Sequence, residues 1–318
     1  MYNESQVAEE FIKRATAALS SVPDYEIIVV DDGSKDDTFA IVSAIADNDR
    51  HIKIVRFARN FGHQTATTAG IDLAAGDTVT VIDADLQDPP ELIPRLIEKW
   101  REGADIVFAV RESRAGESAF KKATAAAYYR ILRRSAQIDI PLDTADFRLM
   151  SRRATEGLKA MRERSRYMRG LVGWMGLSRA SVMYHRDPRF AGETKYPLHK
   201  MFRLAADGIM SFSTKPLQLA TVLGLASAAL GFLVALGAVF TKLTGGYVVP
   251  GWTSTIVAVL FVGGVQLVTL GVIGAYIGRV YDEVRNRPLY LIEAVRGFDD
   301  RTAEHFSRSP LPTLKDLR

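Results

Sequence analysis

Residues 78–91, TVTVIDADLQDPPE, indicate the fold class of this chain. The first part has the β-branched composition of a buried strand. Four carboxylates follow within nine residues: Asp83, Asp85, Asp88 and Glu91. Because side chains alternate along a strand, Asp83 and Asp85 are expected on one side, with Ala84 pointing away. Carboxylates together with substrate phosphates are the usual ligands of Mg²⁺. The pair therefore predicts a metal–diphosphate site, although a D-x-D tripeptide taken alone more often marks a solvated turn.

The end of the same stretch has the spacing of a helix start. Asp88 stands at the N-cap position, proline at the first helical position and Glu91 at the third. These two acids are therefore expected to be structural, which leaves Asp83 and Asp85 for the ion.

Strand and helix patterns alternate through the first 110 residues. We expect strands at residues 26–30, 52–57, 78–83 and 105–110. Helical spacing covers residues 7–19, 39–45 and 64–75; Ser34 and Asp37 form a capping box and Gly76 ends the third helix. This alternation predicts an α/β fold with a mostly parallel sheet, whose ligands bind outside the carboxyl ends of the strands.

Two long segments, 217–240 and 253–278, contain no charged residue. About 20 apolar residues span a bilayer as a helix, so we expect two membrane spans, at about 217–240 and 253–280, rather than two buried helices of a soluble core. Lysine and arginine flank the pair of segments, whereas the loop between them carries only Lys242. By the positive-inside rule, we expect both ends of the chain, and with them the whole soluble part, to face the cytoplasm.

Composition excludes several classes of protein. The chain has 318 residues, of which 47% are hydrophobic and 25% charged, as in globular proteins. The chain has a net charge of +4, and basic residues cluster beside the apolar segments, which favours anionic lipid over nucleic acid as a partner. The absence of cysteine excludes disulfides, thiolate nucleophiles and iron–sulfur clusters.

Seven short motifs follow one another along the chain. They are YNE (2–4), VDDGSKDDT (30–38), RNFGHQ (59–64), DADLQDPPE (83–91), AVR (109–111), DFRLMSR (146–152) and GETKY (192–196). As a set they resemble the family 2 glycosyltransferases, and more narrowly the polyprenyl-phosphate sugar transferases that include bactoprenol glucosyltransferases and dolichol-phosphate mannose synthases. The resemblance extends to about residue 295. It implies the GT-A fold, a nucleotide-sugar-binding αβ sandwich, and a C-terminal hairpin of transmembrane helices.

The resemblance also implies the donor site. Asp85 is the main ligand of Mg²⁺ or Mn²⁺, Gln87 a second ligand, and Asp83 lies against the nucleotide within reach of the ion. The implied nucleotide-sugar positions are Tyr2, Glu4, Val30, Asp32, Asp83 and Ala84. For Asp32, a plain turn aspartate is the alternative. UDP-glucose is the favoured donor, with mannose, galactose and aminoarabinose donors as alternatives.

The implied acceptor is a polyprenyl phosphate, which is already largely ionised at neutral pH and has to be held by cations. The candidates are Arg111, one of Lys121 and Lys122 (Lys122 is preferred), Arg189 and Lys195. Each is equally well explained as a solvated surface charge. Asp146 and Arg111 are the catalytic candidates. Asp146 acts either as a base or, as we favour, by orienting the acceptor; an N-cap or an ion pair with Arg148 is the structural alternative. The implied reaction inverts the anomeric carbon.

The expected domains are a catalytic domain at 1–195, an amphipathic interfacial helix at 196–214, two spans within 215–282 and a cytoplasmic tail at 283–318. Family members begin with a hydrophobic strand before the YNE motif, whereas here only Met1 precedes it, so we expect Met1 to be an internal methionine of a longer chain. A G-x-x-x-G pattern at 274–278 suggests helix packing in a homo-oligomer.

Three other functions fit less well. A processive polysaccharide synthase requires a Q-x-x-R-W motif, which the sequence lacks. A nicotinamide oxidoreductase requires G-x-G-x-x-G after the first strand. A membrane scaffold with an inactive transferase domain conflicts with the intact Asp83, Asp85 and Arg111.

Overall fold

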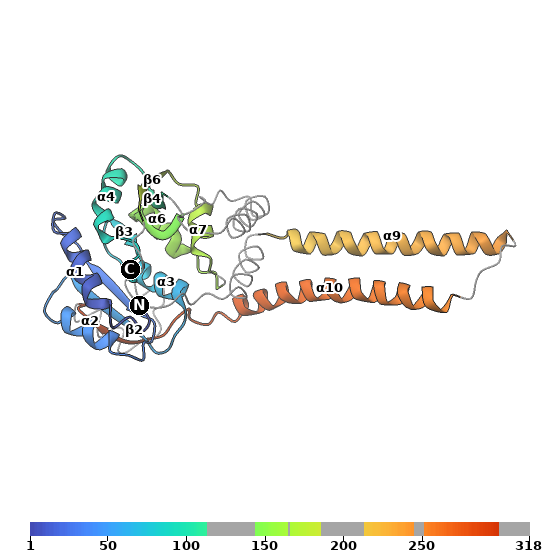
Figure 1. Ribbon diagram of the computed structural model, residues 1–318, viewed down its shortest axis with the longest axis horizontal. Coiled ribbons are helices and arrows are strands. Elements are labelled where there is room, and N and C mark those ends of the chain that lie inside the picture. Colours follow the sequence, from blue (N-terminus) through green and yellow to red (C-terminus); the bar gives the residue numbers. More distant parts are fainter. Residues whose placement is uncertain (113–143, 165, 186–212, 245–250, 299–318) are drawn as a thin grey trace. The chain divides into compact units, whose positions relative to one another are not determined.

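The computed structural model describes residues 1–112, 144–164, 166–185, 213–244 and 251–298 (Figure 1). The chain divides into two compact units. The described residues of the first unit are 1–112, 144–164, 166–185 and 287–298, and those of the second are 213–244 and 251–286.

The first unit begins with α1 (Ala8–Ala18), β1 (Ile27–Asp31), α2 (Thr38–Ala46), β2 (Ile52–Phe57) and α3 (His63–Leu73). Strands β1 and β2 pair in parallel, with Ile27 opposite Ile52. A later strand, β7 (Ile292–Arg296), pairs antiparallel with β2 and completes a three-stranded sheet. The sequence analysis assigned residues 283–318 to a tail and missed this strand.

A second sheet has the strand order β3-β5-β4-β6. Its strands are β3 (Thr78–Val81), β4 (Ile106–Arg111), β5 (Thr144–Ser151) and β6 (Arg179–Tyr184). The connecting helices are the 3₁₀ turn η1 (Pro90–Leu92), α4 (Ile93–Arg101), α6 (Arg152–Ala160) and α7 (Met168–Trp174). Strand β5 pairs antiparallel with both β3 and β4, whereas β4 and β6 are parallel. The α/β class is confirmed, but both sheets are mixed, because β5 inserts antiparallel between two strands that the alternation pattern treated as parallel neighbours.

Helix α1 buries the face that its spacing predicted. In α1, Phe11, Ile12 and Ala15 are at most 5% exposed and pack with Val29 and Ile54 of the first sheet. The second core forms where Leu96 of α4 packs with Phe147 and Leu149 of β5. The predicted strands at 26–30, 52–57 and 105–110 agree with β1, β2 and β4 to within one residue.

Two predicted helix ends differ in the structure, one at the start of α2 and one at the end of α3. Ser34 does not cap α2: its amide donates to Asp31 Oδ1 (3.0 Å), and its Oγ accepts from the amide of Asn3 (3.0 Å). Helix α3 ends at Leu73, with Ala74 rather than Gly76 after it. Local spacing could not predict either outcome.

The first residue runs beside the end of β1. The amino group of Met1 donates to the carbonyl of Val30 (2.6 Å), and the amide of Asp32 donates to the carbonyl of Met1 (2.9 Å). Together with the Asn3–Ser34 bond, these contacts hold the YNE motif over the loop that follows β1.

Strand β7 closes tightly on β2. Tyr290, just before it, stacks on Phe57 with ring centroids 5.1 Å apart. Gly297, just after it, has φ +77°, and a Cβ at that position would lie 2.2 Å from the carbonyl oxygen of Ile52. Only glycine fits this close approach of two backbones.

The second unit contains the helices α9 (Lys215–Leu243) and α10 (Trp252–Val284), which run side by side (Figure 1). Segments Lys215–Gly237 and Val257–Val284 are long and apolar enough to cross a membrane, and almost none of their side chains are buried. The predicted interfacial helix at 196–214 lies outside the described residues, apart from its last two positions.

Candidate active site

The candidate site lies at the carboxyl ends of β1, β2 and β3. After β1, the chain turns at Gly33, whose φ is +71° and whose Cβ, if present, would lie 2.6 Å from the backbone of Arg59. This close approach brings the DDGS turn against the RNFGHQ motif. Asp32 fixes the contact, since its carboxylate accepts the amides of Phe61 (2.6 Å) and Gly62 (2.9 Å).

Asp32 is 3% exposed, and its two oxygens are already used by backbone donors. Burial raises the pKa of Asp32, and the two amide hydrogen bonds act in the opposite direction. Its position therefore agrees with the turn aspartate that the sequence analysis left as the alternative. Asp32 places His63, the next residue after Gly62 and the first residue of α3.

Strand pairing brings a second carboxylate to the end of β3. Strands β3 and β5 are antiparallel, with Val81 opposite Arg148. Two residues beyond the end of β3, the Asp83 carboxylate comes within 4.8 Å of that of Asp146, which lies two residues before Arg148 in β5. Within β5, Phe147 and Leu149 face the core, so Asp146 and Arg148 face the opposite side. Two motifs 63 residues apart in sequence therefore converge at one point.

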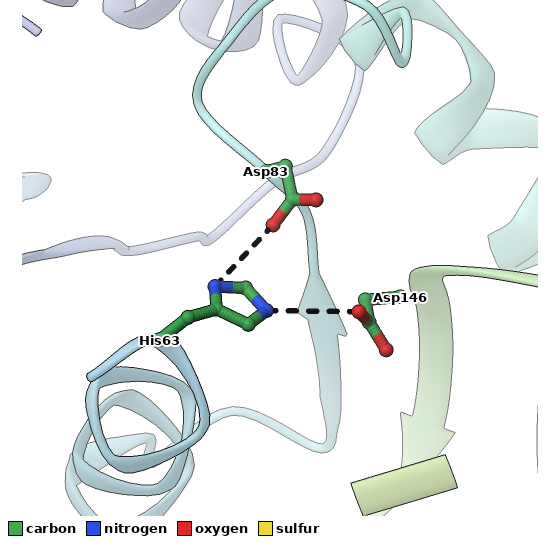
Figure 2. A group of neighbouring side chains, drawn as sticks. All are labelled: His63, Asp83 and Asp146. Carbon is green, nitrogen blue, oxygen red and sulfur yellow. Dashed lines mark ion pairs between the residues drawn. The ribbon is translucent and has the colours of Figure 1, made fainter. Parts of the chain in front are cut away.

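His63 lies between these two carboxylates (Figure 2). Its Nδ1 is 3.8 Å from Asp83 Oδ1 and its Nε2 is 3.6 Å from Asp146 Oδ2. In the part of the chain that the structure describes, these three side chains form a group whose ligand atoms all lie within 4.8 Å of one another. The arrangement is suited to hold a divalent cation.

Asp146 is held by cations on several sides. Arg169 of α7 forms a bidentate pair with it, through Nε (3.0 Å) and Nη2 (3.2 Å). Arg148, which is 1% exposed, approaches to 3.7 Å. Burial would raise the pKa of Asp146, but the contacts with His63 and Arg169 outweigh it and hold that pKa well below its usual range.

The pKa values of Asp83 and His63 are raised, whereas that of Asp146 is lowered. Burial raises the pKa of Asp83, although His63 opposes this effect. The contact with Asp146 raises the pKa of His63 despite the cost of burial. The site therefore combines one firmly ionised carboxylate with two groups that hold protons more readily than usual.

Asp85 does not join this group in the described residues, because β3 ends at Val81 and strand alternation stops there. Leu86 instead adopts a left-handed backbone (φ +57°) with its side chain 2% exposed. Asp85 Oδ1 accepts the amide of Gln87 (3.1 Å). The prediction that Asp83 and Asp85 share one strand face is therefore wrong.

Asp88 and Glu91 are structural, but not as the predicted cap. The 3₁₀ turn η1 has no side-chain cap. Asp88 is fully buried and accepts a short hydrogen bond from the hydroxyl of Tyr184. Glu91 forms a bidentate pair with Arg14 of α1 (both 2.8 Å). Tertiary partners from β6 and α1 thus replace the local capping interaction.

Arg111, at the end of β4, is positioned by this buried pair. Its Nε donates to Tyr184 Oη (3.3 Å) and its Nη2 lies 3.6 Å from Asp88 Oδ1. Burial, together with the hydrogen bond to Asp88, raises the pKa of Tyr184 to about 12, so the hydroxyl remains a donor at neutral pH. The arginine is a partly exposed cation on a rigid support.

The other predicted nucleotide positions surround the β1 turn. Tyr2 is 36% exposed, and the Glu4 amide donates to Thr38 Oγ1 (2.9 Å). Val30 is buried and Ala84 packs against the first core. The predicted phosphate ligands Lys121, Lys122, Arg189 and Lys195 lie outside the described residues.

Sequence reasoning missed His63, Arg169 and Tyr184 as site residues. His63 belongs to a motif that was recognised, yet spacing alone does not say which of its side chains faces the strand ends. Arg169 and Tyr184 carry no motif signal.

Comparison with known proteins identifies the family of this chain. The sequence profile of glycosyl transferase family 2 matches residues 1–158. The chain is 48% identical over 302 residues to the uncharacterized glycosyltransferase YkcC of Bacillus subtilis, which covers 95% of this chain and 94% of that relative. The chain belongs to the family 2 glycosyltransferases. The resemblance, the GT-A fold class and the assignment as a glycosyltransferase are thereby confirmed.

Within this glycosyltransferase family, the SfII prophage-derived bactoprenol glucosyl transferase of Shigella flexneri is 42% identical over 294 residues, 92% of this chain and 95% of the relative. Among solved structures, the mannosyltransferase PcManGT of Pyrobaculum calidifontis in complex with GDP-Man and Mn²⁺ is 16% identical, with a TM-score of 0.44 and 85% of each chain covered. The second likeness is too distant to assign residue roles.

Proposed function

We propose that this glycosyltransferase transfers a hexose, with inversion, from a nucleotide sugar to a polyprenyl phosphate. The observation that carries the proposal is the convergence of Asp83 and Asp146 on His63 at the carboxyl ends of the strands. This site occurs in a chain that is 42% identical, over most of its length, to a bactoprenol glucosyl transferase. The proposed donor is UDP-glucose, because that relative is named as a glucosyl transferase; mannose, galactose and aminoarabinose donors remain the alternatives.

The donor set fits a hard divalent cation, Mg²⁺ or Mn²⁺. Carboxylate and amide oxygens are the ligands such ions prefer, and Asp83, Asp85 and Gln87 lie together in one loop after β3. We assign the ion to these three residues. When bound, it neutralises negative charge on the leaving diphosphate. Tyr2, Glu4, Val30, Asp32 and Ala84 surround the nucleotide, with Asp32 acting through the loop amides that it holds.

Arg111 is the proposed ligand of the acceptor phosphate within the described residues. A guanidinium offers phosphate a planar pair of donors, and the contacts with Tyr184 and Asp88 keep it in place. Lys122, Arg189 and Lys195 are proposed to add charge around the same phosphate. Because the phosphate is already largely ionised, its capture needs cations more than a base.

Asp146 is proposed to orient the site rather than to remove a proton. A carboxylate whose pKa lies far below neutrality is a weak base. Its bidentate contact with Arg169 fixes its position. Asp146 thus supplies a fixed negative charge and an acceptor next to the reacting groups.

We place the protein in the inner membrane as a multi-pass protein, with α9 and α10 as the two spans and both termini in the cytoplasm. Support comes from the length and apolar composition of these helices and from the basic residues that flank them. The proposed division is a catalytic domain at 1–195, an interfacial helix at 196–214, spans within 215–282 and a cytoplasmic segment at 283–318. Homo-oligomerisation through residues 274–278 remains a prediction.

The test is a transfer assay in membranes that contain the full chain. Labelled nucleotide sugars are incubated one at a time with polyprenyl phosphate, with and without a chelator. We expect labelled lipid from UDP-glucose and its loss on chelation. Asp85→Asn should abolish the signal, whereas Glu91→Gln, a matched change outside the site, should not. Absence of labelled lipid from every donor would refute the proposal.

A further inference from the structure

We propose that His63 is itself a ligand of the divalent cation, through Nδ1, and that Asp146 holds the imidazole in the orientation this requires. The inference rests on the proposed function, because it assigns a residue of the same donor site. It adds a nitrogen ligand from α3 to the oxygen ligands from the loop after β3.

The distance between the two facing atoms fits a shared ion. Two ligand atoms that each lie about 2.1 Å from one ion are at most about 4.2 Å apart. Nδ1 of His63 and Oδ1 of Asp83 are separated by 3.8 Å, which is within that limit but too long for a direct hydrogen bond. Both side chains are partly exposed, at 48% and 37%, so an ion from solvent can reach them.

The opposite side of the ring has the partner that a metal-binding histidine usually has. Such a histidine typically donates its second ring N–H to a carboxylate, which fixes the tautomer and leaves the other nitrogen free for the ion. Nε2 of His63 faces Asp146 at 3.6 Å, as Figure 2 shows. This separation is slightly longer than a hydrogen bond, and contacts of this kind commonly tighten when ligands bind.

Both neighbours of His63 in the chain are fixed, so the ring is placed before any ion arrives. Gly62 donates its amide to Asp32 Oδ2 (2.9 Å). Gln64 accepts the amide of Met168 at the start of α7 (3.1 Å). Asp146 is in turn held by Arg169. The carboxylate–imidazole arrangement is therefore supported from the β1 turn, from α7 and from β5.

A nitrogen ligand has a consequence for the choice of ion. Imidazole binds first-row transition ions better than Mg²⁺, which prefers oxygen ligands and retains its waters. His63 should therefore favour Mn²⁺ over Mg²⁺ at a site that three oxygen donors alone would leave open to both.

The test measures Mn²⁺ binding to the purified full chain in lipid nanodiscs by electron paramagnetic resonance. Pulsed spectra report directly whether a histidine nitrogen is coordinated. We expect nitrogen coupling in the wild type, its loss in His63→Gln and His63→Asn, and a rise in the Kd for Mn²⁺ of roughly tenfold or more. Asp146→Asn should keep the coupling but raise the Kd by about tenfold.

His51→Gln is the matched control. His51 also contacts a carboxylate, with Nδ1 2.7 Å from Asp49 Oδ1, but it stacks on Tyr25 away from the site. Its spectrum and affinity should equal those of the wild type. Two substitutions of His63 are used because the test needs only one variant that folds. Thermal unfolding shows which of the variants are folded.

Absence of nitrogen coupling in the wild type, or its persistence in the His63 variants, would overturn the inference. If labelled lipid still formed from a nucleotide sugar in that case, the proposed function would stand without this ligand. Conversely, nitrogen coupling in a protein that transfers no sugar would support the ligand and refute the function.

Discussion

The two ends of helix α3 both carry ionisable side chains, but these side chains differ in their exposure to solvent and in their partners. At the first residue, His63 is 48% exposed and lies between the carboxylates of Asp83 and Asp146. Near the last residue, Asp72 is 4% exposed and accepts from Arg162 Nη1 (2.7 Å) and Tyr290 Oη (3.0 Å). One end leaves charged groups open to a ligand, whereas the other closes them with protein partners.

Tyr290 is one of the two partners that bind the buried Asp72 at the C-terminal end of α3. It belongs to the segment after α10, stacks on Phe57 and leads into β7. Burial, reinforced by Asp72, raises the pKa of Tyr290 well above its ordinary value, so the hydroxyl remains a donor. The comparison teaches that burial and the number of protein partners, more than residue type, separate a structural ion pair from a candidate site.

Replacing Asp72 by Asn should have the largest effect on stability. The substitution removes the charged partner of Arg162, whose side chain is 29% exposed, and a hydrogen bond between charged groups contributes about 1.5–3 kcal/mol to the unfolding free energy. Sugar transfer per folded molecule should be retained, because Asp72 lies at the closed end of the helix. Thermal unfolding in detergent and the transfer assay measure the two quantities.

The double variant Asp72→Asn with Arg162→Met is the control. It should recover part of the lost stability, because neither charge is then left alone. Equal stability of Asp72→Asn and wild type would remove the distinction between the two ends of α3.

Replacing Asp146 by Asn should lower sugar transfer by about 100-fold, equivalent to about 2.7 kcal/mol in the activation barrier. The amide cannot keep the fixed charge between Arg169 and His63. At Mn²⁺ concentrations that saturate both the wild type and the variant, binding of the donor nucleotide should change little. Initial rates in the transfer assay, with nucleotide titration as the control, test this; a wild-type rate would remove Asp146 from the mechanism.

Replacing Tyr290 by Phe should destabilise the protein by about 1–2 kcal/mol. The ring still stacks on Phe57, but a buried carboxylate loses one hydrogen bond. The unfolding temperature should fall less than for Asp72→Asn, and transfer should persist. A fall as large as that of Asp72→Asn would mean that the hydroxyl, rather than the ion pair, holds the closed end.

Replacing Glu91 by Gln should have the smallest effect, below about 1 kcal/mol. Its pair with Arg14 is bidentate, but the two side chains are 52% and 28% exposed, so water and salt weaken the attraction. The loss should shrink further in high salt, as measured by thermal unfolding. A large, salt-independent loss would show that exposure is a poor guide to the strength of these pairs.

Sequence patterns predicted individual strands and helices better than they predicted the contacts between distant parts of the chain. Strands β1, β2 and β4 and the apolar helices α9 and α10 followed from composition and periodicity, because these signals lie within each element. Strand β7 was missed, since its five residues, IEAVR, carry no strong period and gain their stability by pairing with β2. Ser34 and Asp88 matched capping patterns, but each side chain found a stronger partner far along the chain.

The glycosyltransferase family, the two long apolar segments and the acidic groups after β1 and β3 were all predicted from the order of residues along the chain. Each of these features depends on residues that lie close together in the sequence, so short motifs are enough to reveal it. Three features became visible only in the folded chain: Asp146 lies near Asp83, His63 lies between them, and Tyr290 contacts Asp72 near the other end of α3. Strand pairing accounts for these features, because β5 pairs with β3 and β7 pairs with β2. Such pairing joins residues that are distant in sequence, and no local pattern encodes its register.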